Sequence, residues 1–220
     1  QFNIGLDIGL FKSRLNLTLD AYHKLTYDLL QNVNLPPSNG YSSRVDNFGE
    51  IENKGFEISL QADLIKNNNF SWNLYSNFSL NRNKLISLNS NLDYQLGPSI
   101  GFTEARPIMF MVGQPLGIFW GAETNGIFEN WEQANSSGIT NAAPGEINYV
   151  NYSVTYDEFG NPSENQLIDF DDYVKIGDPN PDFTYSFGSE FNYKNWDLSI
   201  LFTGQEGGDL FWVDSWQLSG

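Results

Sequence analysis

Few side chains in this sequence could act as a nucleophile or build a metal site. Cysteine is absent, and His23 is the only histidine. A Ser-His-Asp triad would have to rest on His23 alone, and a site made of several histidines or cysteines is impossible. The sequence also has no Gly-x-Ser-x-Gly turn, no phosphate-binding glycine loop and no paired-acid motif. We therefore expect no enzyme activity, no catalytic residue and no bound cofactor, and we interpret His23 as an ordinary residue of an extended segment.

Carboxylates are the one plentiful group with metal-binding chemistry. Residues 121–182 include 12 acidic side chains and a single basic one, Lys175. Those that could offer oxygen atoms to a hard cation such as calcium are Asp157, Glu158, Asp169, Asp171 and Asp172. Their spacing does not match the twelve-residue calcium-binding loop. A solvated acidic surface is therefore the favoured interpretation, and we predict no metal site.

Aromatic side chains are scattered through the same stretch of the chain. They are Trp120, Phe128, Trp131, Tyr149, Tyr152 and Tyr156. Exposed rings of this kind could stack on sugars or pack against a protein partner. They could equally form the small core of a long connection that is folded in its own right. The sequence leaves both alternatives open and assigns no substrate-binding residue.

The composition excludes two further classes of protein. With 11 basic and 27 acidic residues the formal net charge is −16, which repels nucleic-acid phosphates, so no nucleic-acid partner is expected. The longest apolar run, Ile108 to Val112, is far shorter than the roughly 20 residues of a membrane-spanning helix. Aromatic residues make up 15% of the chain and glycines number 20, which is typical of strands and turns. Because the chain begins within an alternating pattern, we expect an internal fragment of a longer protein.

The elements that position these residues are predicted by a period of two. Apolar and polar residues alternate along six segments, which short turns join in pairs. The paired segments are 2–10 with 15–21, 56–64 with 70–80, and 183–193 with 196–203. Each pair predicts a β-hairpin.

Three features favour a membrane barrel over a soluble β-sandwich, whose strands also alternate. The segments are long, and roughly 11 tilted residues cover the apolar band of about 25 Å in a membrane barrel. The short turns all fall on one edge, whereas the connections on the other edge are long. Aromatic residues also flank the short turns, where a membrane–water interface is expected. These are Phe11, Phe70, Trp72, Phe191, Tyr193 and Trp196.

Charge decides which face of the sheet meets water. The polar positions include Asp7, Arg14, Asp20, Glu57, Asp63, Asn77, Asn81, Glu190 and Asp197. Unpaired charges are costly in hydrocarbon, so we expect this face to line a wet lumen and the apolar face to contact lipid. Six strands cannot close such a barrel, because the smallest have about eight. The predicted fold class is thus all-β, an antiparallel transmembrane β-barrel segment of about six long strands in three hairpins.

We expect three regions along the chain. Residues 1–87 would form two barrel hairpins with one extracellular loop, and residues 88–182 a long acidic extracellular loop region. Residues 183–220 would form a third barrel hairpin and the start of the next extracellular loop. This assignment follows the usual arrangement of short periplasmic turns and longer extracellular loops.

Several short motifs occur in order along the chain. They are residues 51–57 (IENKGFE), 77–84 (NFSLNRNK), 113–119 (GQPLGIF), 144–149 (PGEINY) and 176–181 (IGDPNP), the last followed by 193–199 (YKNWDLS). Together they resemble the SusC/RagA family of TonB-dependent outer-membrane transporters. One departure concerns residues 151–160, which lack the Asp-x-Asn-Gly-Asp-Gly run that the family commonly has there. For that reason the resemblance implies no metal site in this chain.

The resemblance implies a roughly 22-stranded barrel with an N-terminal plug, of which this chain would be part of the C-terminal half. It implies import of oligomeric nutrients, glycans or peptides, across the bacterial outer membrane. The implied partners are the remainder of the barrel and plug, a SusD-like surface lipoprotein acting as a lid, TonB through regions outside this chain, and the lipid and lipopolysaccharide of the outer membrane. The alternative is a secreted β-rich glycan-binding module without a membrane role.

Overall fold

In a computed structural model of the protein, the structure describes residues 1–34, 43–47, 49–88, 92–99, 106–153, 157–160 and 167–212. The chain divides into two compact units. The first unit comprises residues 1–95, 110–116 and 179–210, and the second comprises residues 96–109, 117–178 and 211–220. No helix in the described ranges is both long and apolar enough to cross a membrane.

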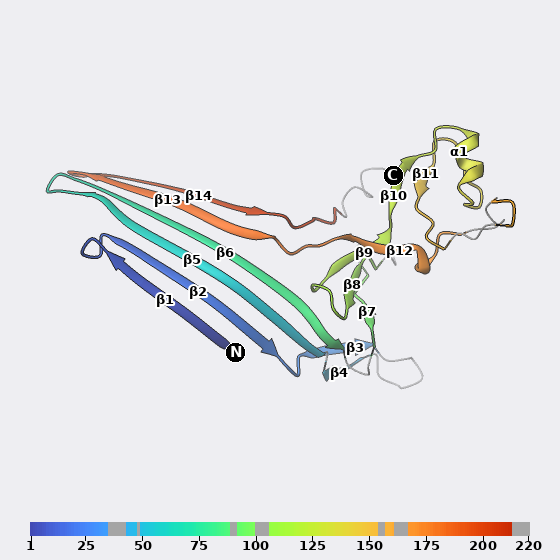
Figure 1. Ribbon diagram of the computed structural model, residues 1–220, viewed down its shortest axis with the longest axis horizontal. Helices are drawn as coiled ribbons and strands as arrows, with labels where there is room; N and C mark the ends of the chain where they lie inside the picture. The colour runs from blue at the N-terminus through green and yellow to red at the C-terminus, as the bar shows by residue number, and fades with distance from the viewer. Residues whose placement is uncertain are drawn as a thin grey trace. The chain divides into compact units, whose positions relative to one another are not determined.

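The first unit is built on an antiparallel sheet of six strands in the order β1-β2-β5-β6-β13-β14 (Figure 1). The strands are β1 (Phe2–Leu10), β2 (Leu15–Thr26), β5 (Gly49–Lys66), β6 (Phe70–Leu88), β13 (Phe183–Tyr193) and β14 (Trp196–Glu206). The pairs β1–β2, β5–β6 and β13–β14 are consecutive in the chain and hydrogen-bonded. The three hairpins predicted from the alternation are therefore confirmed.

The three hairpin turns lie together at one end of this sheet (Figure 1). In the first turn Phe11, Lys12 and Ser13 have φ angles of 54°, 60° and 61°, a left-handed conformation that non-glycine residues adopt mainly in turns. In the second turn, Asn67 Oδ1 accepts a hydrogen bond from the backbone N–H of Phe70 at 2.8 Å. Local turn chemistry thus closes these two hairpins within a few residues.

Strands β5 and β6 are longer than the alternation predicts, with 18 and 19 residues. Their pairing continues to Gly49 opposite Leu88. Leu85 and Leu88 are buried at this end, packed against Leu29, Ile51, Phe110, Val112 and Leu116. Burial of these apolar side chains stabilises the extension of the hairpin.

A bulge interrupts the regular pairing of β5 near its hairpin turn. The register shifts between Asp63 and Ile65, so that Ile65 rather than Leu64 lies opposite Trp72. Alternation through Leu64 was expected, and the structure differs because one extra residue is inserted there. Arg14 holds the bulge in place, since its guanidinium donates to the carbonyl oxygens of Asp63 at 2.9 Å and Leu64 at 2.7 Å.

The connections opposite the short turns contain further elements. β3 (Leu30–Asn34) and β4 (Ser43–Asn47) form a two-stranded sheet between β2 and β5. A four-stranded sheet has the order β12-β9-β8-β7. Its strands are β7 (Tyr94–Leu96), β8 (Ile108–Met111), β9 (Ile118–Ala122) and β12 (Tyr173–Gly177). None of these strands was predicted from the sequence.

The second unit also contains a short helix and a small sheet. β10 (Thr124–Ile127) pairs with β11 (Ile147–Tyr149), and between them lies α1 (Trp131–Ser136). A 3₁₀ turn, η3 (Phe170–Asp172), precedes β12. Asn130 begins α1 by accepting a hydrogen bond from the backbone N–H of Gln133 at 2.9 Å. The buried apolar residues of this unit include Met109, Ile118, Phe128 and Ala134.

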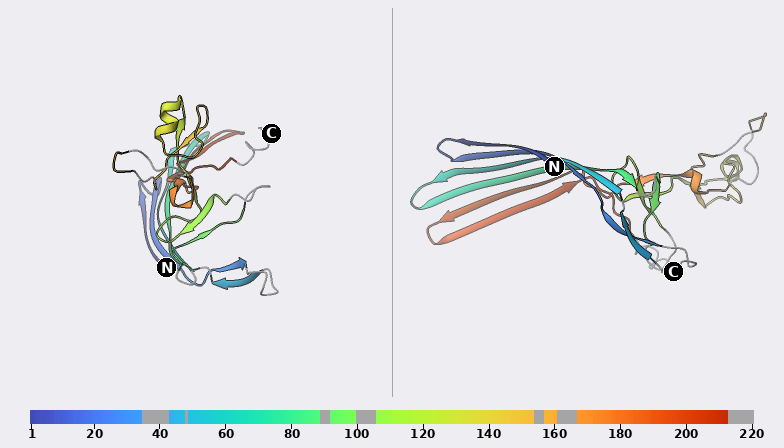
Figure 2. Two further views of the ribbon diagram at one scale, coloured as in Figure 1. Left: turned by 90° about the vertical axis from the view of Figure 1, so that its right-hand side faces the viewer. Right: turned by 90° about the horizontal axis from the view of Figure 1, so that it is seen from below.

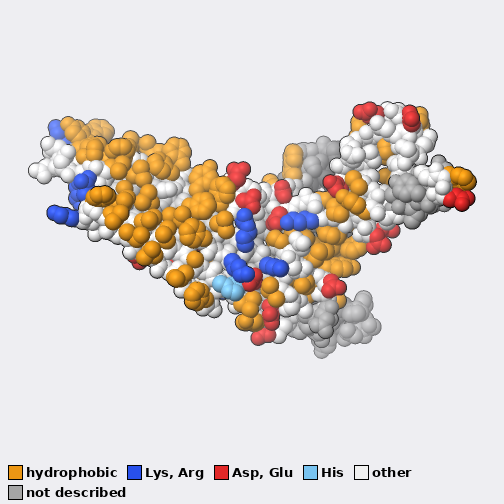
Figure 3. Space-filling view, in the orientation of Figure 1, with side chains coloured by type: hydrophobic (Ala, Val, Ile, Leu, Met, Phe, Trp, Pro, Cys, Tyr) orange, Lys and Arg blue, Asp and Glu red, His pale blue; other side chains and the backbone are white. Residues whose placement is uncertain are grey.

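The register places the apolar residues of the six strands on one face. Leu17 lies opposite both Ile8 and Leu60, and Ile58 lies opposite both Leu19 and Phe78. Figure 2 shows that the sheet is curved, and Figure 3 shows a broad area of apolar side chains over one of its faces. Exposed members of this face include Ile4, Leu6, Phe56, Phe187, Ile200 and Phe202. An uncovered apolar face of this extent is what lipid contact requires.

Candidate functional site

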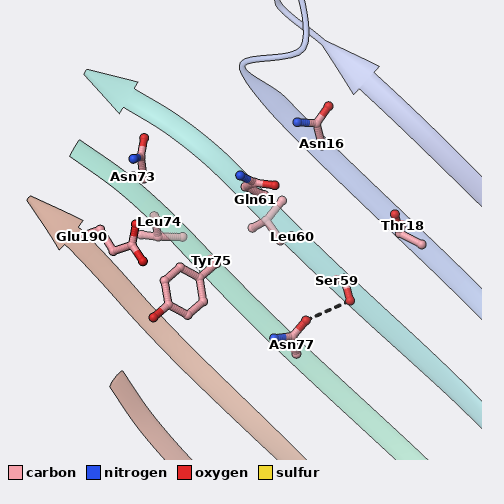
Figure 4. A pocket seen from close by; sticks show the side chains of 10 residues that line it. All are labelled: Asn16, Thr18, Ser59, Leu60, Gln61, Asn73, Leu74, Tyr75, Asn77 and Glu190. Carbon is pink, nitrogen blue, oxygen red and sulfur yellow. Dashed lines mark hydrogen bonds between the residues drawn. The ribbon is translucent and has the colours of Figure 1, made fainter. Parts of the chain in front are cut away.

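The polar face of the six-stranded sheet contains an open hollow of about 390 Å³ (Figure 4). Amide and hydroxyl groups dominate its lining, and β2, β5, β6 and β13 all contribute. The polar lining residues are Asn16, Thr18, Ser59, Gln61, Asn73, Tyr75, Asn77 and Glu190. Such a surface offers many hydrogen bonds and a single charge, which suits water, a polar oligomer or another polar part of the same protein.

Hydrogen bonds link the polar side chains across the strands. Thr18 Oγ1 donates to Asp7 Oδ1 at 2.6 Å. Ser59 Oγ donates to Asn77 Oδ1 at 2.8 Å, the bond drawn in Figure 4, and Asn77 Nδ2 donates to Ser186 Oγ at 3.1 Å. The five residues form one row because they are register partners on adjacent strands. Cross-strand pairs of this kind stabilise a sheet and leave further donors and acceptors for solvent.

Two tyrosines of the polar face lie against glycines on the neighbouring strand. A β-carbon added at Gly188 would come within 2.1 Å of the Tyr75 ring, and one at Gly55 within 2.2 Å of the Tyr22 ring. The hydroxyl of Tyr22 donates to Asn81 Oδ1 at 3.0 Å. The glycines therefore provide the space in which each ring lies close to the sheet.

The charged residues of this face are mostly acidic. Asp20 lies opposite Glu57 in the register, so two carboxylates are neighbours across the strands. Like charges in that position disfavour pairing unless water or a cation separates them. Arg14 is the one basic residue predicted for this face, and its guanidinium donates hydrogen bonds to the carbonyl oxygens of the β5 bulge. The polar face thus presents an acidic surface.

The aromatic residues of the second unit divide between the two roles that the sequence left open. Phe128 is 2% exposed and belongs to the core. Trp131 and Tyr152 are 62% and 55% exposed, while Trp120 and Tyr149 are half-buried. The remaining aromatic, Tyr156, lies outside the described residues. Trp131 and Tyr152 are accordingly the rings of this set that could meet a partner.

Three of the five carboxylates considered for calcium accept hydrogen bonds from the backbone. Asp172 is buried and accepts hydrogen bonds from the backbone N–H groups of Ser153 at 2.9 Å and Asp169 at 3.1 Å. Burial alone would raise the pKa of Asp172, but these hydrogen bonds outweigh it and hold the pKa below its ordinary value. Asp169 accepts from the N–H of Asp171, and Asp157 from that of Phe159, both at 2.9 Å. Within the described ranges no three such side chains gather into a possible metal site.

His23 lies near the end of β2 and contacts a carboxylate. Its Nε2 atom is 2.8 Å from Glu52 Oε1, which is also 2.9 Å from the ammonium nitrogen of Lys54. These three side chains gather around the carboxylate of Glu52 and do not form a paired nucleophile and base.

A comparison with protein families decides the identity of the fold. The family described as "TonB dependent receptor-like, beta-barrel" matches residues 1–219. The chain belongs to this TonB-dependent receptor family.

Individual relatives agree with the family. The chain is 34% identical over 213 residues to TonB-dependent receptor P3 of Formosa agariphila, covering 96% of this chain and 20% of the relative. It is 26% identical to TonB-dependent receptor SusC of Bacteroides thetaiotaomicron, covering 90% and 18%. A solved structure of the RagAB peptide importer in the "closed-closed" state superposes with a TM-score of 0.70 at 25% identity, covering 94% of this chain and 21% of that one. The chain therefore spans about a fifth of the length of the relatives that it matches.

These findings confirm the resemblance to the SusC/RagA family and the fold expected from it. The six-stranded sheet is part of a TonB-dependent receptor barrel, whose family is located in the bacterial outer membrane. Members of the family are transporters and not enzymes. The alternative of a secreted glycan-binding module is not supported by this membership.

Proposed function

We propose that the protein containing this chain imports oligomeric nutrients, glycans or peptides, through a SusC-like barrel. The six strands would form part of the wall, with the short turns in the periplasm. Residues 88–182, together with the connection between β2 and β5, would lie outside the cell. The single observation that carries this proposal is the division of one sheet into an exposed apolar face and a hydrogen-bonded, acidic polar face.

The polar face suits a passage for polar oligomers or for the plug that would fill it. The hollow of Figure 4 is lined by amides and hydroxyls, which exchange hydrogen bonds readily with water, sugars and peptide groups. Support for peptides comes from the RagAB importer, which is named for that cargo. The SusC relative carries no substrate in its name, so the proposal covers both classes of oligomer.

A SusD-like lipoprotein is the proposed lid, and it would meet the acidic second unit. Trp131 and Tyr152 are exposed there, and exposed aromatic side chains are frequent anchors of protein interfaces. The acidic side chains around them favour a lid with basic residues at its contact surface.

Uptake by living cells tests the proposed function. Cells that carry or lack the full-length gene would be given fluorescent oligopeptides and, separately, fluorescent oligosaccharides. We expect accumulation of one class to require both the gene and an intact TonB system. A variant lacking the TonB-interacting segment, present in the outer membrane at the same level, is the matched control. Equal accumulation with and without the gene, for both classes, would refute the proposal.

A further inference from the structure

Basic side chains gather where the apolar face of the first unit ends. The register places His23, Lys54 and Arg82 in one row across β2, β5 and β6. Two residues away along the same face lies the apolar row Ala21, Phe56 and Leu80. Lys84 occupies the next position on that face of β6, two residues beyond Arg82. We call His23, Lys54, Arg82 and Lys84 the basic collar.

The cationic groups of the basic collar are accessible to solvent. The side chains of Lys54 and Arg82 are 58% and 52% exposed, and Lys84 is exposed as well. Figure 3 shows Lys, Arg and His side chains close together beside the apolar area, with Asp and Glu side chains among them. They stand out because the chain has only 11 basic residues against 27 acidic ones.

Existing ion pairs leave part of this positive charge uncompensated. Glu52 forms an ion pair with Lys54 and contacts the ring of His23, and its register partner on β6 is Lys84. Arg82 reaches Asp182 Oδ1 at 3.0 Å and the Asp182 carbonyl oxygen at 2.7 Å. In the described part of the chain Lys84 contacts no carboxylate within ion-pair distance. An added anion would therefore find at least one unpaired ammonium group, with exposed pairs beside it that are weak in water.

The position of the basic collar determines which anion it can meet. It lies at the end of the strands opposite the short turns, which in outer-membrane barrels is the extracellular side. Its side chains share the face that contacts lipid, so acyl chains would lie over the row of Phe56 and headgroups over Lys54 and Arg82. Phosphate groups bind Arg through paired hydrogen bonds and Lys through a compact charge. Clusters of Lys and Arg beside a membrane attract anionic lipid headgroups.

We propose that the basic collar binds the phosphate groups of an anionic glycolipid in the outer leaflet of the outer membrane. The inference rests on the proposed function for the direction in which the barrel is inserted. Within the six strands of this sheet the basic collar spans β2, β5 and β6, while the neighbouring β13–β14 hairpin ends in Glu206.

Glycolipid that remains bound during purification provides the test. The full-length protein would be extracted in mild detergent from native outer membranes, and phosphorylated glycolipid per barrel would be quantified by mass spectrometry. The variant Lys54→Gln/Arg82→Gln/Lys84→Gln should retain several-fold less glycolipid. The matched control, Lys12→Gln/Lys66→Gln/Lys194→Gln, removes three cations beside the short turns and should retain the normal amount. Equal retention by the two triple variants would overturn the proposal.

A second variant and an assembly assay serve as controls for misfolding. Lys54→Gln/Lys84→Gln keeps Arg82 and its contacts with Asp182, and it should still lose at least half of the bound glycolipid. Only protein that shows the heat-dependent mobility of a closed barrel is scored. Because this readout needs no substrate, a failure of the uptake experiment leaves it unaffected. If nutrient uptake were normal and the two triple variants retained equal amounts of glycolipid, the basic collar would be rejected as a glycolipid site while the proposed function would stand.

The chemistry of the ligand is tested with purified lipids. Delipidated protein would be offered lipid A, the same lipid A without its phosphates, or inorganic phosphate alone. We expect the triple collar variant to bind lipid A at least fivefold more weakly than the unaltered protein does. Dephosphorylated lipid A should bind the unaltered protein no more tightly than lipid A binds the triple variant. Equal binding of dephosphorylated lipid A would show that acyl chains alone suffice. Displacement of lipid A by inorganic phosphate at equal concentration would assign the collar to a soluble anion. Either result would contradict the proposal.

Discussion

The ring of Tyr75 on β6 occupies the space beside Gly188 on β13, where a β-carbon would lie only 2.1 Å from the ring. The two residues are register partners, so the glycine and the tyrosine form one cross-strand unit on the polar face. Tyr75 also lines the hollow of Figure 4. The shape of the proposed lumen at this level therefore depends on the absence of a single side chain.

Substitution of Gly188 should displace the ring of Tyr75 and weaken the pairing of β6 with β13. We expect Gly188→Ala to destabilise the full-length barrel by about 1–3 kcal/mol, because a methyl group is forced into occupied space. Urea unfolding in detergent would measure this loss. Gly9→Ala is the control, since its β-carbon would meet neighbours at an ordinary 3.6 Å. Adding Tyr75→Ser should restore most of the stability, and no restoration would show that the ring is not the cause.

Arginine should be tolerated on one face of the sheet and not on the other. Leu17→Arg or Leu60→Arg should impair assembly by about 2–4 kcal/mol if these residues face the middle of the bilayer. Asn16→Arg and Gln61→Arg, one position away on the same strands, should assemble normally. The yield of heat-modifiable barrel in outer-membrane fractions measures the difference. Equal damage from both sets would contradict the assignment of the faces.

Removal of one acceptor from Asp172 should loosen the segment around it. Asp172→Asn keeps the size of the side chain but leaves one oxygen to serve the N–H groups of Ser153 and Asp169. A hydrogen bond to a charged group contributes about 1.5–3 kcal/mol. The Asp169 N–H should be affected most, because the Ser153 N–H also donates to Asn151 Oδ1 at 3.0 Å. Amide hydrogen exchange at Ser153 and at 169–172 should become faster by the factor to which this loss of free energy corresponds. Exchange in β5 should be unchanged. Unaltered exchange at these amides would disprove the structural role of Asp172.

The same carboxylate predicts a pH dependence with a definite sign. The pKa of Asp172 is lowered in the folded protein, so its contribution is complete above the ordinary aspartate value of about 3.9. The contribution is lost as the pH falls through the lowered folded value. Protection of the Ser153 amide, corrected for intrinsic exchange, should therefore be constant from about pH 7 to pH 5 and fall only below about pH 4. A loss of protection that began near neutrality would assign the effect to another group.

Ser189 should contribute more to the stability of the barrel than its small side chain suggests. It is buried on the apolar face and accepts a hydrogen bond from the indole N–H of Trp72 at 2.7 Å, while the Trp72 ring stacks on Phe191 with centroids 5.5 Å apart. Ser189→Ala would leave the indole N–H without an acceptor where water is scarce, at a cost of about 1–2 kcal/mol. The urea midpoint should fall accordingly. Ser199→Ala, an exposed position, should have no effect, and equal shifts would argue against this role.

The six strands were predictable because one physical requirement, lipid on one side and water on the other, acts on every second residue. Ile8, Leu17 and Leu60 alternate with Gly9, Asn16 and Gln61, and the register confirms that each set lies on one face. The bulge at Leu64 was not predictable, because an inserted residue leaves both of its neighbours compatible with alternation. The residue associated with the bulge is Arg14, whose guanidinium donates to the carbonyl oxygens of Asp63 and Leu64.

The long connections were harder to read because their order comes from packing between segments distant in sequence. Leu85 and Leu88 are buried by residues 110–116, and no local pattern indicates that pairing. The hollow and the basic collar likewise join side chains from three or four strands. Each becomes visible only when the register between hairpins is known.

If the sheet is part of a barrel wall, adjacent residues of β5 face lipid and water in turn. Single spin labels at positions 58, 59, 60 and 61 of the full-length protein, made free of other cysteines and placed in bilayers, test it directly. The labels at Ile58 and Leu60 should collide mainly with oxygen dissolved in lipid, and those at Ser59 and Gln61 mainly with a water-soluble nickel chelate. The same collision ratio at all four positions, or the opposite alternation, would contradict the assignment of the two faces.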